Sequence, residues 1–247
     1  MGIERIRNEA LRQRVTTAED AAKLIHNGDI VGTSGFTAVG YPKAVPAALA
    51  RRAEQGEDLG ITVIVGGNAG EQLDGTLGRS GILRRRYGYQ SNDFVRAQTN
   101  ADKIKYIDMH VSHVPFYVKN GYLGHIDTAI FEIAGIDEKG NLIPSCAVGI
   151  MDVLAQCADK VILEINDTIP EEIAGMHDIY TPERFPNTRP IPILHPGDRV
   201  GVPYVKCDPD KIKAIVFTHE EDSNKDLMAP NEEMRAIADH LIAFLKD

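Results

Sequence analysis

The sequence predicts an α/β protein built on a mainly parallel sheet with crossover helices. Apolar, strand-like runs alternate along the chain with helical patterns, and Gly and Pro residues separate them. Two of the predicted strands end in glycine-rich segments, which we name the glycine loop (residues 35–42) and the second turn (residues 66–70). Ligands of open α/β sheets bind outside the carboxyl ends of the strands, so these segments predict a shared crevice.

The first elements are predicted from helix caps and a short apolar run. Thr17-x-x-Asp20 resembles a capping box that begins a helix, and Gly28 is placed to end it. Residues 29–33 then predict the first strand, which leads into the glycine loop. An alanine-rich run after this loop predicts a helix from about residue 46 to residue 55.

Apolar runs bounded by turn residues predict the remaining strands. The segment between residues 168 and 209 is rich in proline and lacks periodicity, so we expect an irregular excursion over the sheet. Asn231 is placed to cap a last helix, whose apolar stripe up to residue 245 requires burial on this domain, on a second half or on another subunit. The predicted strands are 61–65, 106–111, 128–134, 160–165 and 214–217.

Composition limits the classes of partner. A length of 247 residues with 43% hydrophobic residues permits an ordinary buried core, and the net charge of −9 argues against binding to nucleic acid or to an anionic membrane. The three cysteines lack CxxC spacing, and neither a membrane span nor a secretory signal is recognisable. We therefore expect a cytoplasmic protein, or a mitochondrial one in a eukaryote, with neither nucleic acid nor membrane as a partner.

The glycine loop is the main candidate for a binding site. Its glycines are expected to leave backbone N–H groups open to a ligand, and Pro42 ends it where a helix can begin. The residues alone leave open a plain strand-to-helix turn. The loop does not match GxGxxG, and no GK[ST] follows it, so neither a dinucleotide nor a P-loop nucleotide is supported.

Two other motifs are weaker, and a third is absent. The basic run at residues 84–86 could pair with phosphates, although such runs more often form a solvated face. Asp108, His110 and His113 have spacing that could hold a metal, but a strand-to-turn transition separates such side chains, so we predict no metal. The absence of GxSxG removes support for a serine-hydrolase route to thioester cleavage.

Several segments, taken in order, resemble the acetyl-CoA hydrolase/transferase family, a branch of the coenzyme A transferases that use a glutamate nucleophile. The glycine loop is similar to the loop after that family's first strand, and the resemblance extends over roughly residues 29 to 245. The segments that carry it are Ser34-Gly35-Phe36-Thr37, Gly40-Tyr41-Pro42-Lys43-Ala44-Val45-Pro46, and residues 77–86, 106–110, 161–166, 175–179 and 211–216.

The resemblance implies the half-domain fold of coenzyme A transferases, which sugar-phosphate isomerases and sugar-sensing regulators share. Residues 1–247 then form the N-terminal domain, and the half that carries the nucleophilic glutamate is absent. No residue of this sequence matches the family's Thr-Glu or Ser-Glu motif, so no catalytic residue is assigned to it. The family uses coenzyme A as a substrate, and we expect neither a metal nor a redox cofactor.

The implied activity moves coenzyme A between an acyl-CoA and a small carboxylate through a glutamyl-CoA intermediate. Interception of an intermediate by water would make the enzyme a hydrolase instead. The chain alone is expected to be inactive and to act with its C-terminal half or a partner subunit, as a homodimer. The residues implied to bind substrate are Gly35, Phe36, Thr37, Gly40 and Pro42 in the glycine loop, with Gly67 and Asn68 in the second turn.

The sequence leaves two questions open. The alternative function is a sugar-phosphate isomerase-like or sugar-sensing binding module. The preferred acid is also open, because some transferases of this branch carry an arginine where this chain has Asp222-Ser223-Asn224-Lys225. If that arginine steers a dicarboxylate, Lys225 is the candidate substitute.

Overall fold

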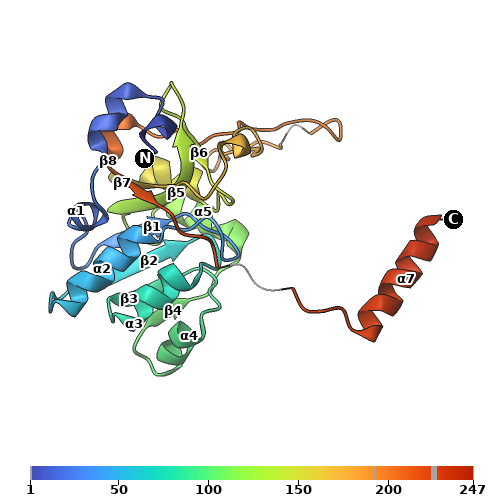
Figure 1. Cartoon of the computed structure of the whole chain (residues 1–247), viewed down its shortest axis with the longest axis horizontal. Coiled ribbons are helices and arrows are strands. Elements are labelled where there is room, and N and C mark those ends of the chain that lie inside the picture. The colour runs from blue at the N-terminus through green and yellow to red at the C-terminus, as the bar shows by residue number, and fades with distance from the viewer. Residues whose placement is uncertain (1, 192, 224–226, 247) are drawn as a thin grey trace.

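One mainly parallel sheet forms the centre of the protein, as expected. The computed structural model describes residues 2–191, 193–223 and 227–246, and within them eight strands form one sheet. These are β1 Ile30–Thr33, β2 Ile61–Val65, β3 Leu83–Tyr87, β4 Lys105–Ile107, β5 Thr128–Ile136, β6 Leu142–Pro144, β7 Lys160–Asn166 and β8 Ile212–Thr218. Seven strands pair in parallel in the order β4-β3-β2-β1-β5-β7-β8, and β6 pairs antiparallel with β5. The chain leaves β1 toward β4 and later returns to its other side, so a topological switch point lies between β1 and β5 (Figure 1).

Helices cover both faces of this sheet. The described α-helices are α1 Ala18–Ala22, α2 Ala44–Glu54, α3 Thr76–Arg79, α4 Asp93–Asn100, α5 Val114–Lys119, α6 Met151–Cys157 and α7 Glu232–Lys246. Residues of α1 to α4 share one buried core with the sheet, and residues of α5 and α6 share the other. Short 3₁₀ turns occupy Ile3–Arg5, Glu9–Arg14, Val111–His113, Glu171–Ile173 and Pro209–Lys211, and a π turn occupies Glu71–Gly75.

The two-residue period of a strand explains how two cores share one sheet. In β5, Ile130 packs into the core with α2, whereas its neighbour Phe131 packs into the core with α6. Glu132 follows on the α2 side of the same fully buried strand. In the parallel register Glu132 lies beside Glu164 of β7, so neighbouring strands bring two carboxyl groups into the interior together.

Most predicted elements are confirmed, with shifts at their ends. Thr17 accepts a hydrogen bond from the Asp20 N–H at 3.1 Å, but α1 ends at Ala22, well before Gly28. The strand expected at 106–111 is only Lys105–Ile107, because the chain enters a 3₁₀ turn soon afterwards. The described part of the excursion at 168–209 forms no strand or α-helix, and part of it projects from the body as an arm (Figure 1).

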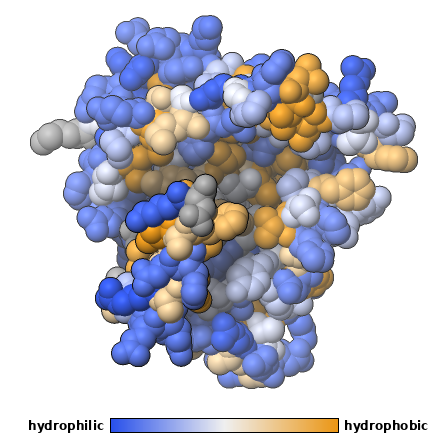
Figure 2. Space-filling model, turned by 90° about the vertical axis from the view of Figure 1, so that its right-hand side faces the viewer, coloured by the Kyte–Doolittle hydropathy of each residue, from blue (hydrophilic) through white to orange (hydrophobic). Residues whose placement is uncertain are grey.

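The last helix forms as predicted but does not pack on this domain. The Asn231 side chain accepts a hydrogen bond from the Met234 N–H at 2.8 Å and so caps α7. The described residues of α7 are all exposed, and the helix extends away from the sheet (Figure 1). Burial of its stripe on this domain is therefore wrong, and burial on a second half or another subunit stays a prediction. Figure 2 shows apolar side chains scattered among polar ones on the side toward which α7 projects. No described helix is long and apolar enough to cross a membrane.

Candidate functional site

Several loops meet at the carboxyl edge of the sheet. The glycine loop follows β1 and the second turn follows β2, while a further loop at residues 145–150 follows β6. After β8 the chain crosses back over the glycine loop at residues 220–223, which we call the crossing segment. The site therefore lies beside the switch point, where open α/β sheets bind ligands.

The tip of the glycine loop is a tight turn with an unusual backbone. Phe36 and Val39 exchange two backbone hydrogen bonds of 3.0 and 3.1 Å. Between them, Thr37 and Ala38 have φ angles of 53° and 66°, a left-handed region that non-glycine residues rarely adopt. Such strain persists only where surrounding contacts hold it, and the Ala38 N–H donates to the Asn68 carbonyl at 3.3 Å. The second turn thus supports the tip.

Gly40 is required by both backbone and packing. Its φ is +67°, and a Cβ atom there would lie 2.7 Å from the Ala147 backbone nitrogen. Gly67 is similarly close to the glycine loop, since its Cβ would lie 2.7 Å from the Phe36 ring. These contacts join the glycine loop, the second turn and the 145–150 loop into one packed unit.

The expectation that the loop leaves its N–H groups open to a ligand is wrong for four residues. The N–H groups of Phe36, Ala38, Val39 and Gly40 all donate within the protein. Gly40 donates at 3.2 Å to each carboxylate oxygen of Asp222 in the crossing segment. At these four positions the loop therefore offers shape rather than an open donor.

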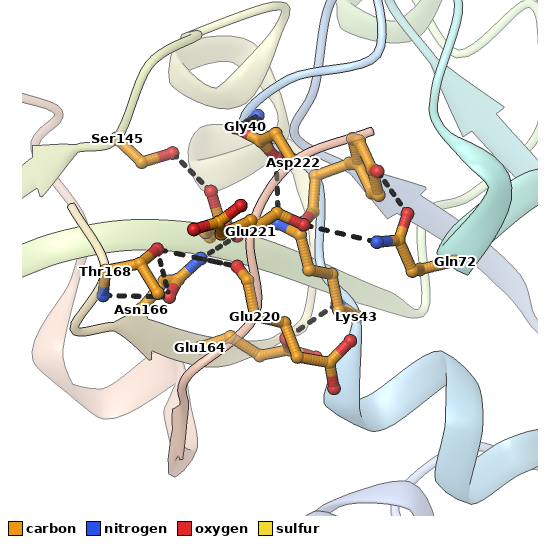
Figure 3. Close-up of polar contacts among 12 residues, drawn as sticks. Gly40, Lys43, Gln72, Ser145, Glu164, Asn166, Thr168, Glu220, Glu221 and Asp222 are labelled. Carbon is orange, nitrogen blue, oxygen red and sulfur yellow. Dashed lines mark hydrogen bonds and ion pairs between the residues drawn. The ribbon is translucent and has the colours of Figure 1, made fainter. Parts of the chain in front are cut away.

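A buried ion cluster lies beneath this loop, and sequence reasoning missed it (Figure 3). Lys43, Glu132 and Asp222 have side chains that are 0%, 0% and 6% exposed. The Lys43 Nζ pairs with Glu132 and, at 2.9 Å, with Asp222. Glu132 also accepts hydrogen bonds from the Ser145 hydroxyl at 2.8 Å and from the Asn166 amide at 3.0 Å. Every carboxylate that contacts Lys43 therefore has further partners.

The charged state of this cluster follows from burial and from its neighbours. Burial lowers the pKa of the Lys43 ammonium, but Glu132 and Asp222 outweigh this effect, so its pKa is raised on balance. Burial also raises the pKa of Glu132, against the opposing effect of Lys43. Lys43 is thus the cation that compensates two buried acids.

Glu164 supplies the N-terminal cap of α2 from another strand. Its carboxylate accepts hydrogen bonds from the backbone N–H groups of Lys43, Ala44 and Val45, at 2.7, 3.0 and 2.7 Å. The residue at the N-cap position, Lys43, makes no side-chain capping bond of its own, so Glu164 serves the first turn instead. Burial raises the pKa of Glu164 to about 7.

This raised pKa predicts a pH-dependent stability. The folded-state pKa of about 7 exceeds the ordinary 4.5, so folding takes up a proton between these values. The resulting stability is fully present below about pH 4.5 and is lost as the pH rises through about 7. Relative to Glu164→Gln, we expect the wild type to lose roughly 2–3 kcal/mol of unfolding free energy between pH 5 and about pH 8.5.

Urea denaturation at both pH values measures this difference. Glu172→Gln, which neutralises an exposed carboxylate, is the control and should leave the pH dependence of the wild type unchanged. A gap between wild type and Glu164→Gln that stays constant over this pH range would contradict the prediction.

The structure brings the residues predicted to bind substrate into one region. Gly35, Phe36, Thr37, Gly40 and Pro42 form the glycine loop, which contacts Gly67 and Asn68 in the second turn. Phe36 and Thr37 are exposed, whereas the Asn68 side chain is buried and accepts a hydrogen bond from the Ser91 N–H at 2.9 Å. A cavity of about 350 Å³ adjoins both loops, and its lining includes Ala38, Asn68, Gly70, Arg79, Phe94 and Ser223.

The basic run at residues 84–86 is in part the solvated face that was expected, since it lies in β3 with Arg84 and Arg85 exposed. Arg86 differs, because it is fully buried and pairs with Asp74 at 2.7 Å, so it is not open to a phosphate. Arg86 also donates to the Gly67 carbonyl at 3.0 Å and supports the second turn.

The described residues contain no group of three metal-ligating side chains, and His110 packs against His113 with ring centroids 5.3 Å apart. Lys225 lies outside the described residues.

A pattern in the sequence carries the signal for the missed cluster. Two fully buried strands contain a similar motif, Ile-Phe-Glu-Ile at 130–133 and Ile-Leu-Glu-Ile at 162–165. A carboxylate at the same place in two buried strands requires a cation or several N–H donors nearby. Lys43, at the end of the glycine loop, is the nearest candidate in sequence order after β1.

Comparisons with known proteins place the chain in a family and support its fold. Residues 3–217 match the family described as "Acetyl-CoA hydrolase/transferase N-terminal domain". The succinyl-CoA:acetate CoA-transferase of Clostridium kluyveri is 43% identical over 98% of this chain and 45% of its own length. The acetyl-CoA hydrolase of Schizosaccharomyces pombe is 36% identical over 97% of this chain and 48% of its own length. The crystal structure of RipA from Yersinia pestis, 20% identical, has the same fold with a TM-score of 0.68 over 99% of this chain and 50% of that one.

The chain spans about half the length of the curated relatives that it matches. The match of the family covers β1 to most of β8 and includes every loop of the site except the crossing segment. The chain therefore belongs to the acetyl-CoA hydrolase/transferase family, in which it represents the N-terminal domain.

Proposed function

We propose that this chain is the N-terminal half of an acyl-CoA:carboxylate CoA-transferase, or of an acyl-CoA hydrolase with the same first steps. The observation that carries the proposal is the braced glycine loop, whose exposed tip at Phe36 and Thr37 stands at the switch point of the sheet. A rigid wall of this kind holds an acyl group in place and excludes water from it. The relatives named above include both a transferase and a hydrolase, which fits a site whose outcome depends on access of water.

The chemistry follows from a glutamate supplied by a complementing half. Its carboxylate attacks the thioester carbon, the carbon–sulfur bond breaks, and an acyl-glutamyl anhydride and a coenzyme A thiolate form. The thiolate then attacks the glutamyl carbonyl, which releases the first acid and leaves a glutamyl-CoA thioester. The carboxylate of the second acid attacks this thioester and expels the coenzyme A thiolate, which leaves a second acyl-glutamyl anhydride. The thiolate then attacks the acyl carbonyl of this anhydride, which gives the new acyl-CoA and restores the glutamate carboxylate.

This half contributes shape rather than a nucleophile. Cys146 of the 145–150 loop is exposed as a residue, but partial burial of its thiol, together with the nearby carboxylates of Asp222 and Glu132, raises its pKa and so lowers its thiolate fraction at neutral pH. The exposed stripe of α7 gives the complementing half an apolar surface to cover, and a pair of such assemblies forms the homodimer.

A complementation assay tests the proposal. The chain is purified alone and also co-expressed with the C-terminal half of the Clostridium kluyveri relative, and both samples receive succinyl-CoA and acetate. We expect no turnover by the chain alone, turnover by the assembly, and a coenzyme A adduct on a glutamate outside this sequence. Robust turnover by the isolated chain, an adduct on one of its own residues, or preferential binding of a sugar phosphate would overturn the proposal.

A further inference from the structure

The crossing segment is held to the rest of the site by each of its four residues. The Glu220 carbonyl accepts a hydrogen bond from the Asn166 amide at 2.7 Å, and the Glu221 carbonyl accepts one from the Gln72 amide at 3.2 Å. Asp222 binds Gly40 and Lys43 (Figure 3). The Ser223 N–H donates to the Tyr41 hydroxyl at 3.1 Å. Contacts from β7, the glycine loop and the π turn after β2 therefore fix one short piece of chain.

These contacts close a ring around the glycine loop. Asp222 accepts a hydrogen bond from the Gly40 N–H of the loop. The Lys43 Nζ pairs with both Asp222 and Glu132, and so connects the crossing segment to β5 of the sheet. Glu132 accepts a hydrogen bond from the Ser145 hydroxyl, and the loop that carries Ser145 packs against Gly40 through Ala147.

The carbonyl of Gly40 also has a side-chain partner. The Ser34 hydroxyl donates to this carbonyl at 2.8 Å. Both backbone polar groups of Gly40 are thereby tied to side chains.

Asp222 connects the crossing segment, to which it belongs, with the Gly40 backbone N–H and with the buried cation Lys43. Removal of its carboxylate frees the Gly40 N–H and leaves Glu132 as the one carboxylate paired with Lys43, whose Nζ also donates to the Tyr41 carbonyl at 3.0 Å. The fold of the sheet does not depend on this contact, since Glu132 and Glu164 keep their other hydrogen bonds. The effect should therefore concentrate on the shape of the loop.

We infer that Asp222 is a positioning residue for the transfer reaction: by binding the Gly40 N–H and Lys43 together, it sets the place of the glycine loop beside the acyl group. The inference rests on the proposed function. Asp222 acts through Gly40 and does not itself contact the reacting atoms. Misplacement of a substrate-positioning wall by about 1 Å can lower turnover by about 100-fold, so a contact of this kind has a measurable effect on the rate.

The test uses Asp222→Ala and Asp222→Asn in the assembly of this chain with the complementing half. We expect Asp222→Ala to lower kcat by about 10- to 100-fold while KM for the acyl-CoA changes by less than about threefold. The reason is that the glycine loop positions the bound acyl group for the chemical steps and contributes little to the binding of the acyl-CoA. Asp222→Asn keeps an acceptor for Gly40 and should recover part of the loss. Glu221→Gln is the matched control, because Glu221 is exposed and contributes its backbone carbonyl to Gln72.

Two results would overturn the inference. One is turnover by Asp222→Ala equal to that of the Glu221→Gln control. The other is a loss of turnover that disappears once rates are expressed per folded molecule, with the folded fraction taken from thermal unfolding at the assay temperature.

A second readout separates this inference from the proposed function. In the chain alone, the Gly40 amide should exchange with solvent deuterium at least about tenfold faster in Asp222→Ala than in the wild type, because its hydrogen-bond acceptor is gone. If the wild-type assembly is inactive, the proposed function fails while this measurement still judges the placement of the loop. Unchanged exchange at Gly40 would overturn the inference whatever the assembly does.

Discussion

Replacing Lys43 by methionine is expected to lower the free energy of unfolding by about 3–5 kcal/mol. Methionine fills a similar volume, so the change removes the charge more than the packing. Glu132 and Asp222 then lie in the interior without the cation that compensates them. An uncompensated buried charge is far more costly than a broken ion pair at the surface.

Equilibrium urea denaturation of the chain measures this loss. Lys105→Met is the control, because Lys105 pairs with Asp102 at 2.6 Å with both side chains exposed, and its loss should cost at most about 1 kcal/mol. Adding Glu132→Gln and Asp222→Asn to Lys43→Met removes the stranded charges and should recover part of the stability. The buried-charge explanation fails if the triple variant is no more stable than Lys43→Met alone.

Replacing Gly40 by valine is expected to cost about 2–5 kcal/mol of stability and most of the turnover in the assembled enzyme. The residue has a φ of +67°, which a β-branched side chain tolerates poorly. Its Cβ would also meet the Ala147 backbone nitrogen at 2.7 Å, and a backbone atom cannot rotate away as a side chain can. Relief requires movement of the 145–150 loop, and the Ser145 hydroxyl bond to Glu132 resists that movement.

Gly81→Val is a matched control for this prediction. Gly81 has a φ of +77°, but its Cβ would meet no atom within 4 Å. It should therefore show the backbone strain alone, about 1–2 kcal/mol, and leave turnover in the complementation assay unchanged. Equal losses of stability in the two variants would show that the contact with Ala147 adds nothing.

Local sequence patterns predicted the elements whose cause is local. The strands around the site are apolar runs, and the glycine loop has glycines where the backbone needs a positive φ. The ion cluster was missed because its members meet only in the folded chain: Lys43 and Glu132 are 89 residues apart, and the pairing of β5 with β7 brings Glu164 alongside. β3 was missed for a related reason: three consecutive arginines look solvated, and in the fold Arg84 and Arg85 are exposed, whereas Arg86 is buried beside Asp74.

The terminal helix shows a different limit of prediction. Its cap and its apolar spacing are local features, and both predicted α7 correctly. The surface that covers its stripe is not encoded in that spacing, because any apolar face of suitable size would serve. The periodicity therefore established that a helix forms but not where it docks.

The placement of Glu132 and Glu164 side by side also bears on how the sheet assembles. The side chains of a strand alternate between its faces, so a slip of one residue in β5 would turn Glu132 away from Lys43 and into the core that holds Phe131. The same slip in β7 would remove the cap from α2. Apolar strands flanked by apolar strands tolerate such errors readily, because one face resembles the other. Two acids at matching positions make the misaligned sheets costly, so the cluster favours the correct alignment of β5 with β7.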